Sequence, residues 1–153
     1  MSEMMIPYWL LVCHLVGDYL LQSDWMAQEK TKNSWAALCH AATYTLPFAV
    51  LIAIYTGTAW PVEEGAVLAI MLIMWSHFII DHWRLARHVG WVKNFLAPPG
   101  GMKGDTIWWH PWSQCSGTGY HKDKPAWLTV WLMIITDNTL HLAINGLAWY
   151  LAQ

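Results

Sequence analysis

Histidine and aspartate side chains recur one helical turn apart inside the apolar segments of this chain. The spacing H-x-x-x-D occurs at His14 and Asp18 and again at His77 and Asp81, and the reverse, D-x-x-x-H, occurs at Asp137 and His141. One further histidine, His40, stands alone in an apolar segment. Residues four apart lie on one face of a helix. Ionisable groups are costly inside a membrane and usually serve a partner or a function there. The pattern therefore predicts that these seven side chains converge on one site.

Imidazole and carboxylate groups together are typical ligands of borderline divalent metals. Zn²⁺ is the expected ion, with Mn²⁺ or Fe²⁺ as alternatives, and seven ligands suffice for one or two ions, because a catalytic zinc commonly takes about three. Gln22 and Asn138 lie close to the ligands in the sequence and are expected to hydrogen-bond to them. A bound metal would polarise a scissile bond and lower the pKa of a bound water. Asp18 or Asp81 could then act as the general base.

Three other interpretations of the polar residues remain open on the sequence. The first is that they pair across helices and only hold the bundle together. A second is an ion or proton pathway, because chains of intramembrane histidine and aspartate also carry protons. The third is a non-enzymatic membrane protein that binds a partner protein. Metal retention after chelation, ion flux in liposomes and tolerance of joint apolar replacement would separate these alternatives.

The elements that carry these residues are predicted to be membrane-spanning helices. Apolar residues make up 56% of the 153 residues and charged residues 12%, and there are 13 tryptophans, a residue that gathers at membrane–water boundaries. Four apolar segments are long enough to span a bilayer, namely 4–22, 35–57, 65–83 and 126–151. The predicted fold is thus all-α, a single domain over 1–153 built as a four-helix transmembrane bundle in the lipid bilayer. The sequence predicts no nucleic-acid partner and is compatible with an oligomer.

The longest connection divides into two parts of different composition. Residues 84–96 alternate basic and apolar side chains at near-helical spacing, which predicts a helix lying along the cytoplasmic interface. Residues 98–125 are rich in glycine, proline and tryptophan and are predicted to be irregular, with the cluster Trp108–Trp112 in the headgroup region. Arg84 is expected on the face of the second H-x-x-x-D motif, where it and Arg87 could bind a phosphate group of a substrate.

The basic residues define the predicted orientation. All eight Lys and Arg residues fall in the first and third connections, at positions 30 and 32 and at positions 84, 87, 93, 103, 122 and 124. Because basic residues mark the cytoplasmic side, both termini are expected on the non-cytoplasmic side of the membrane. The candidate ligands then lie nearer the cytoplasmic leaflet, and the expected substrate is a lipid-linked phosphoester that approaches from that leaflet.

Three segments resemble the motifs of the domain-of-unknown-function family numbered 3307. They are HLVGDYLLQSDW (His14–Trp25), SHFIID (Ser76–Asp81) and TDNTLH (Thr136–His141), and the resemblance extends to His40. That family comprises small membrane proteins of bacteria and their phages and has no assigned activity. The resemblance therefore implies a location in the bacterial inner (cytoplasmic) membrane but no reaction. Asn138 stands where the family motif has glutamine, a change that leaves the neighbouring candidate ligands in place.

A more distant likeness concerns the chemistry. Intramembrane H-x-x-x-D sets are similar to those of inner-membrane metal-dependent hydrolases. The HLVGD stretch at His14–Asp18 also resembles the H-x-x-G-D helices that bind zinc in zinc phospholipase C and P1-type nucleases. These likenesses imply a metal-dependent hydrolase in which His and Asp side chains bind catalytic zinc. Together with the residue pattern, they make a metal-dependent membrane hydrolase the leading hypothesis.

Overall fold

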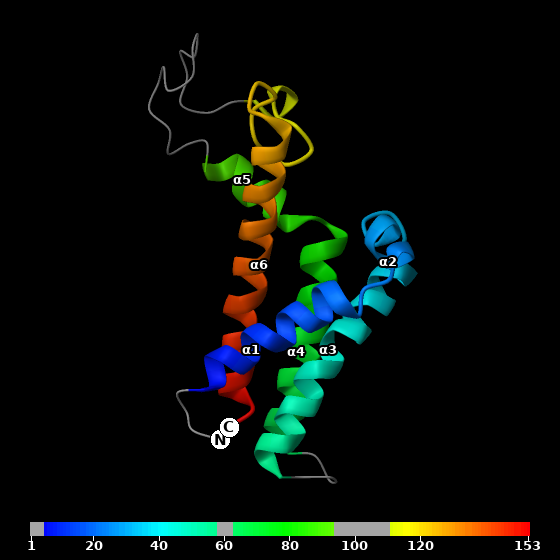
Figure 1. The fold of residues 1–153 in the computed structure, drawn as a ribbon, viewed down its shortest axis with the longest axis vertical. Coiled ribbons are helices and arrows are strands. Elements are labelled where there is room, and N and C mark those ends of the chain that lie inside the picture. Colours follow the sequence, from blue (N-terminus) through cyan, green and yellow to red (C-terminus); the bar gives the residue numbers. More distant parts are fainter. Residues whose placement is uncertain (1–4, 58–62, 94–110) are drawn as a thin grey trace. The chain divides into compact units, whose positions relative to one another are not determined.

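The computed structural model describes residues 5–57, 63–93 and 111–153. These residues are helical apart from turns, loops and one isolated β-bridge between Cys115 and His121. The helices are α1, α2, α3, α4, α5 and α6, at Ile6–Leu15, Asp24–Glu29, Ser34–Thr56, Glu64–His82, Leu85–Lys93 and Ala126–Leu151 (Figure 1). A π-helical turn, Val16–Leu20, extends α1, and a short 3-10 turn spans Trp112–Gln114. The predicted all-α fold is confirmed.

Three helices in the described part of the chain are long and apolar enough to cross a bilayer: α3 with 23 residues, α4 with 19 and α6 with 26. Each begins and ends within one residue of a predicted span. The predicted span 4–22 instead contains a shorter apolar helix over Ile6–Leu20. The chain leaves that helix before Ser23, whose hydroxyl caps α2 by accepting a hydrogen bond from the backbone N–H of Met26. Three apolar helices of this length indicate a membrane protein.

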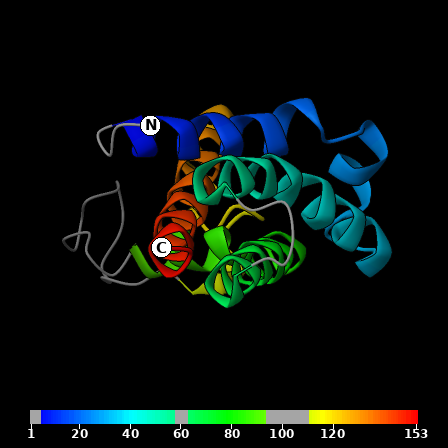
Figure 2. The ribbon, with the colours of Figure 1, turned by 90° about the horizontal axis from the view of Figure 1, so that it is seen from below.

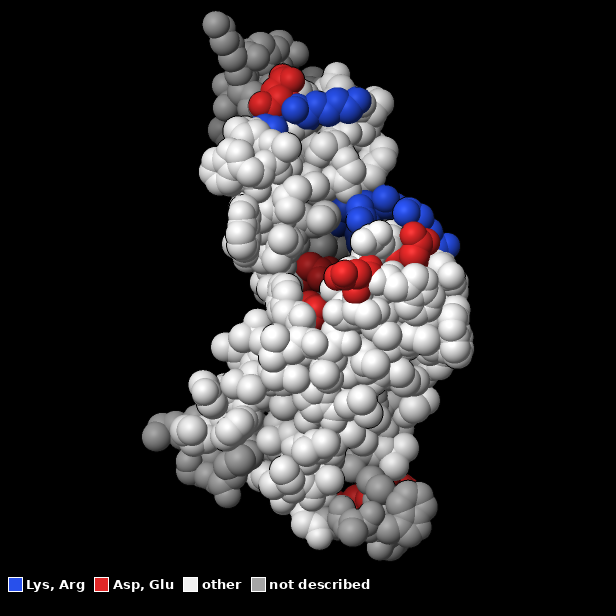
Figure 3. Space-filling view, turned by 45° about the vertical axis from the view of Figure 1, so that its right-hand side comes forward, with Lys and Arg blue, Asp and Glu red and all other residues white. Residues whose placement is uncertain are grey.

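The chain groups into two compact units. We call Met1–Trp83 with Leu140–Gln153 the bundle, and Arg84–Thr139 the connecting unit. In the bundle, α3 is the central helix and lies between α1 and α4 (Figure 2). Because α3 contains no Lys, Arg, Asp or Glu and α4 has them only near its two ends, the middle stretch of both helices carries no charge, and the face shown in Figure 3 has a broad uncharged area.

The buried residues of the bundle change from polar at one end to apolar at the other. On α3 the buried polar residue His40 is followed along the chain by the buried apolar residue Phe48. On α4 the order is reversed, because the buried apolar residues Ala69 and Ile73 precede the buried polar residue His77. Since α3 and α4 run antiparallel (Figure 1), the polar stretches of the two helices meet at one end. Fully buried small residues such as Ala69 let the helices approach closely at the apolar end. A polar site is thus held on one side by a packed apolar core.

The connecting unit begins where α4 stops. Arg84 has a φ of 48°, a left-handed conformation, and lies between the end of α4 and the start of α5. Lys93 at the described end of α5 donates a hydrogen bond to Thr136 Oγ1 at 3.0 Å. Residues 111–125 contain only the short 3-10 turn and the isolated bridge, in agreement with the predicted irregular loop. Of the predicted tryptophan cluster, residues 108–110 lie outside the described ranges.

Candidate metal centre

Four buried polar side chains converge in the bundle, and three elements supply them. Asp18 comes from the π-helical turn, His40 from α3, and His77 and Asp81 from α4. One ligand atom from each lies within 4.8 Å of the others. None of the four residues is more than 6% exposed. We call this group the cluster.

The distances inside the cluster are those expected around a single metal ion. His40 Nε2 lies 2.9 Å from His77 Nε2. It also lies 3.1 Å from Asp81 Oδ2 and 3.2 Å from Asp18 Oδ1. His77 Nε2 lies 3.3 Å from Asp81 Oδ2 and 4.0 Å from Asp18 Oδ1. Ligand atoms bound to a tetrahedral zinc at about 2.1 Å are separated by roughly 3.4 Å, so these donors need only small adjustments to share one ion.

The π-helical turn sets the position of Asp18. In this turn the backbone hydrogen bond spans five residues instead of the four of an α-helix: the N–H of Leu21 donates to the carbonyl of Val16 at 3.0 Å. Turns of this kind are rare and are frequent at functional sites. Gly17 within the turn allows a close approach to α3, because a Cβ there would lie 2.7 Å from the backbone oxygen of Tyr44. The carboxylate of Asp18 is thereby brought against the histidine of α3.

His14 lies beside the cluster and is joined to it by Tyr44. Its Nδ1 is 2.9 Å from the Tyr44 hydroxyl, which also accepts a hydrogen bond from Asn145 Nδ2 at 2.7 Å. The Tyr44 ring stacks on His77, with ring centres 3.6 Å apart. Tyr44 and Asn145 lie outside the H-x-x-x-D pattern of the sequence. Each follows a candidate histidine of its own helix by four residues, so the same spacing rule, extended to tyrosine and asparagine, would have found them.

Asp81 connects the cluster to α6. Its Oδ2 belongs to the cluster, whereas its Oδ1 lies 3.1 Å from His141 Nε2. The His141 ring also packs against His77, with 4.2 Å between ring centres. His141 therefore either fixes the Asp81 carboxylate or could ligate an ion on that side of it. The other predicted residues of α6, Asp137 and Asn138, belong to the connecting unit and stay predictions.

Lys30 reaches the cluster from the connection between α2 and α3. Its Nζ lies 2.6 Å from Asp81 Oδ2 and 3.2 Å from His40 Nε2. It donates a hydrogen bond to Gln22 Oε1 at 2.8 Å and lies 3.9 Å from Asp18 Oδ1. This contact connects Gln22 to the cluster through Lys30, and the predicted hydrogen bonds of Gln22 to the ligands stay a prediction. The sequence pattern assigns Lys30 only to the basic residues of the cytoplasmic side, because a loop residue has no helical spacing to reveal it.

Comparisons with known proteins identify the chain by family alone. The family described as "Protein of unknown function (DUF3307)" matches residues 6–98, more than half of the chain. The chain belongs to the DUF3307 family. The match includes all four residues of the cluster, whereas the TDNTLH segment Thr136–His141 lies outside it. No curated protein and no solved structure matches the chain.

Two arginines predicted to bind substrate lie in the connecting unit of this DUF3307 protein. The expected position of Arg84 on the same face as His77 assumes that α4 continues through residue 84. Because α4 ends at His82 and Arg84 has a positive φ, that helical spacing does not apply to Arg84. Arg87 Nε donates to His88 Nε2 at 3.3 Å, and its guanidinium carbon lies 5.6 Å from the centre of the Trp112 ring. A substrate-binding role for Arg84 and Arg87 stays a prediction.

The negative charge of the two carboxylates suits the cluster of this DUF3307 protein to binding a cation. Two buried carboxylates face the single ammonium of Lys30, and buried charges require close compensation. The Nδ1 atoms of His40 and His77 have no hydrogen-bond partner among the described residues, so contacts of Nε2 and ring packing hold both rings. The cluster could therefore hold a metal ion in a membrane protein, as the sequence pattern predicts.

Proposed function

We propose that the cluster binds one divalent metal ion, with Zn²⁺ as the best match and Mn²⁺ or Fe²⁺ as alternatives. The observation that carries the proposal is the spacing of its donor atoms, from 2.9 Å between the two Nε2 atoms to 4.0 Å between His77 and Asp18. A catalytic zinc keeps one position for water or substrate. Asp18 contributes the longest of these distances and is the donor that could most readily leave that position open.

Asp18 is also the residue that we propose as general base. Among the described residues, it makes its hydrogen bond and ion pairs through Oδ1. Asp81 instead uses both oxygens, Oδ1 toward His141 and Oδ2 toward Lys30. We therefore assign the proton-accepting role to Asp18 and the role of a fixed ligand to Asp81. A bound metal would supply the polarisation of a phosphoryl oxygen and a lowered pKa of water.

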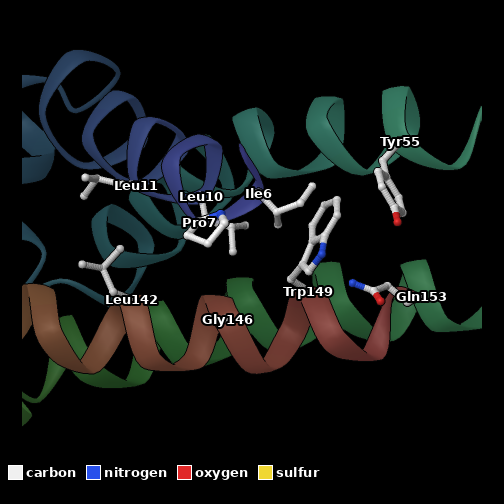
Figure 4. Close-up of a pocket in the computed structure, with 9 residues that line it drawn as sticks. All are labelled: Ile6, Pro7, Leu10, Leu11, Tyr55, Leu142, Gly146, Trp149 and Gln153. Atoms are coloured by element: carbon white, nitrogen blue, oxygen red, sulfur yellow. The ribbon is translucent and has the colours of Figure 1, made fainter. Parts of the chain in front are cut away.

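An apolar groove in the bundle supports a substrate with a hydrocarbon chain. It has a volume of about 700 Å³ and lies between α1, α3 and α6 (Figure 4). Its lining is mainly apolar and comprises Ile6, Pro7, Leu10, Leu11, Tyr55, Leu142, Gly146, Trp149 and Gln153. Leu142 directly follows His141, and Leu10 precedes His14 by one turn, so the groove begins beside the polar end of the bundle. A chain lying in it would bring its head group toward the cluster.

The proposed reaction is therefore hydrolysis of a lipid-linked phosphoester at a bacterial inner membrane. The cluster lies at the end of the bundle that carries Lys30, and basic connections mark the cytoplasmic side. The substrate would enter from the cytoplasmic leaflet, and both termini would lie on the other side. The bilayer and this substrate are the only partners that the proposal needs, whether or not the chain forms an oligomer.

An ion or proton pathway is the second candidate, because the polar contacts are continuous over several residues. Lys30, His40 and His77 follow one another at 3.2 and 2.9 Å, and intramembrane histidines of this kind serve proton relays. The contacts continue through Tyr44 to His14. Beyond them the described part of the bundle has a packed apolar core, which favours a site reached from one side over a pathway across the membrane.

The test combines metal analysis with turnover. Purified protein is analysed for bound metal and incubated with bacterial lipid extract, and release of phosphate-bearing products is followed. Asp81→Asn should lose both metal and turnover, whereas Asp18→Asn should keep most of the metal and lose turnover. Asp24→Asn, a change in α2, is the matched control and should leave both unchanged. Equal product release by wild type and Asp18→Asn would refute the hydrolase. Ion flux in liposomes by metal-free protein would favour the pathway instead.

A further inference from the structure

The ammonium group of Lys30 occupies the position where a metal would bind the cluster. Its Nζ lies 2.6 Å from Asp81 Oδ2 and 3.2 Å from His40 Nε2, two of the proposed ligand atoms. We propose that Lys30 and the metal exclude one another from this position, and that the displaced ammonium binds the anionic phosphoryl group of the substrate. This inference rests on the proposed function and assigns to it a substrate-binding residue.

Exclusion follows from the donor atoms. A metal would use the lone pairs of Asp81 Oδ2 and His40 Nε2 that now face the ammonium. A divalent ion bound at about 2.1 Å from both atoms would lie against Nζ, and two cations in contact in a buried site repel strongly. The ammonium therefore has to leave when the metal enters.

The backbone of Lys30 is held, so the side chain alone has to move. His82 Nδ1–H donates to the carbonyl of Lys30 at 2.8 Å, and the N–H of Lys30 donates to the carbonyl of Met26 at 3.0 Å. His82 Nε2 also lies 3.4 Å from Ser34 Oγ at the start of α3. His82, at the end of α4, thus ties the loop to two helices. A lysine side chain on a fixed backbone can swing its ammonium over several ångströms through its rotatable bonds.

The direction of that movement is set by exposure. The side chain of Lys30 is 19% exposed, whereas those of Asp18 and Asp81 are 8% and 4% exposed. Lys30 therefore approaches the cluster from its open side, and Gln22 Oε1, already bonded to Nζ, lies with it. An ammonium displaced toward water stays at the entrance through which an anionic head group must pass. There it would pair with phosphoryl oxygens next to the metal.

The test measures two affinities that should change in opposite directions. Zn²⁺ affinity is measured by competition with a chromogenic chelator, and inorganic phosphate binding is measured on protein loaded with stoichiometric Zn²⁺. Lys30→Met should bind Zn²⁺ about tenfold more tightly or better, because a charge-assisted contact no longer has to be broken. Its loaded form should bind phosphate at least about tenfold more weakly. Lys30→Arg should retain phosphate binding.

Lys32→Met is the matched control, because Lys32 is 71% exposed and pairs with Glu29 outside the cluster. It should change neither affinity. Lys30→Gln serves as a second variant if Lys30→Met folds poorly. This inference would be overturned, with the metal site left in place, if Lys30→Met and Lys30→Gln bound Zn²⁺ no more tightly than wild type. Unchanged phosphate binding by their Zn²⁺-loaded forms would overturn it as well. Failure of wild type and all variants to bind Zn²⁺ would instead overturn the proposed function.

Discussion

Replacing Asp81 with asparagine removes one charge from the centre of the cluster and keeps the size of the side chain. The carboxylate lies 2.6 Å from Lys30 Nζ, and its side chain is 4% exposed. Removing one partner of a buried ion pair typically costs about 3–5 kcal/mol, because the other charge stays behind without compensation. The side chain of Lys30 is 19% exposed, so we expect the lower part of that range, about 3 kcal/mol in metal-free protein.

The assay is equilibrium unfolding of purified, chelator-treated protein in detergent. Wild type, Asp81→Asn, Lys30→Met and the double variant form a cycle that isolates the coupling between the two residues. About 3 kcal/mol corresponds to roughly a 150-fold change in the ratio of folded to unfolded protein. In the Lys30→Met background, Asp81→Asn should cost at least about 1 kcal/mol less, since no ammonium is left unpaired. Equal costs in both backgrounds would refute the ion pair.

Three further predictions concern the metal, the orientation and the packing of α1. His77→Ala should lose the bound metal and His82→Ala should keep it, as measured by elemental analysis of purified protein; equal metal content would contradict the cluster. A reporter active only in the cytoplasm should stay silent when fused after Gln153, and a signal would reverse the orientation. Gly17→Ala should lower the free energy of unfolding by about 1–3 kcal/mol, because its Cβ would lie 2.7 Å from the Tyr44 backbone oxygen; wild-type stability would contradict that contact.

Spacing within helices made the polar end of the bundle predictable. The pair of His77 and Asp81 shares one face of α4, and the structure places both in the cluster with His40. Apolar length predicted α3, α4 and α6 because uninterrupted apolar runs are long in each. Local rules suffice here, since a regular helix fixes which of its own residues lie side by side.

Contacts that depend on irregular backbone were not predictable in the same way. The π-helical turn breaks the regular spacing between His14 and Asp18, so only Asp18 joins the cluster while His14 bonds to Tyr44. Lys30 comes from a loop, and its position depends on the tertiary contact with His82. Such contacts depend on the path of the chain between helices, which helical periodicity does not encode.

If the first helix spans the bilayer, as the sequence predicts, its short length has a consequence for the lipid around it. Its α-helical and π-helical parts contain 10 and 5 residues, which at the rise of an α-helix amounts to about 22 Å. The hydrocarbon layer of a typical bilayer is about 30 Å thick. A helix shorter than the layer is accommodated by thinning of the bilayer beside it. Phospholipid phosphates next to Asp18 would then lie deeper than elsewhere in the bilayer. The membrane surface would bend toward the site, and the substrate would not have to leave the membrane to reach it.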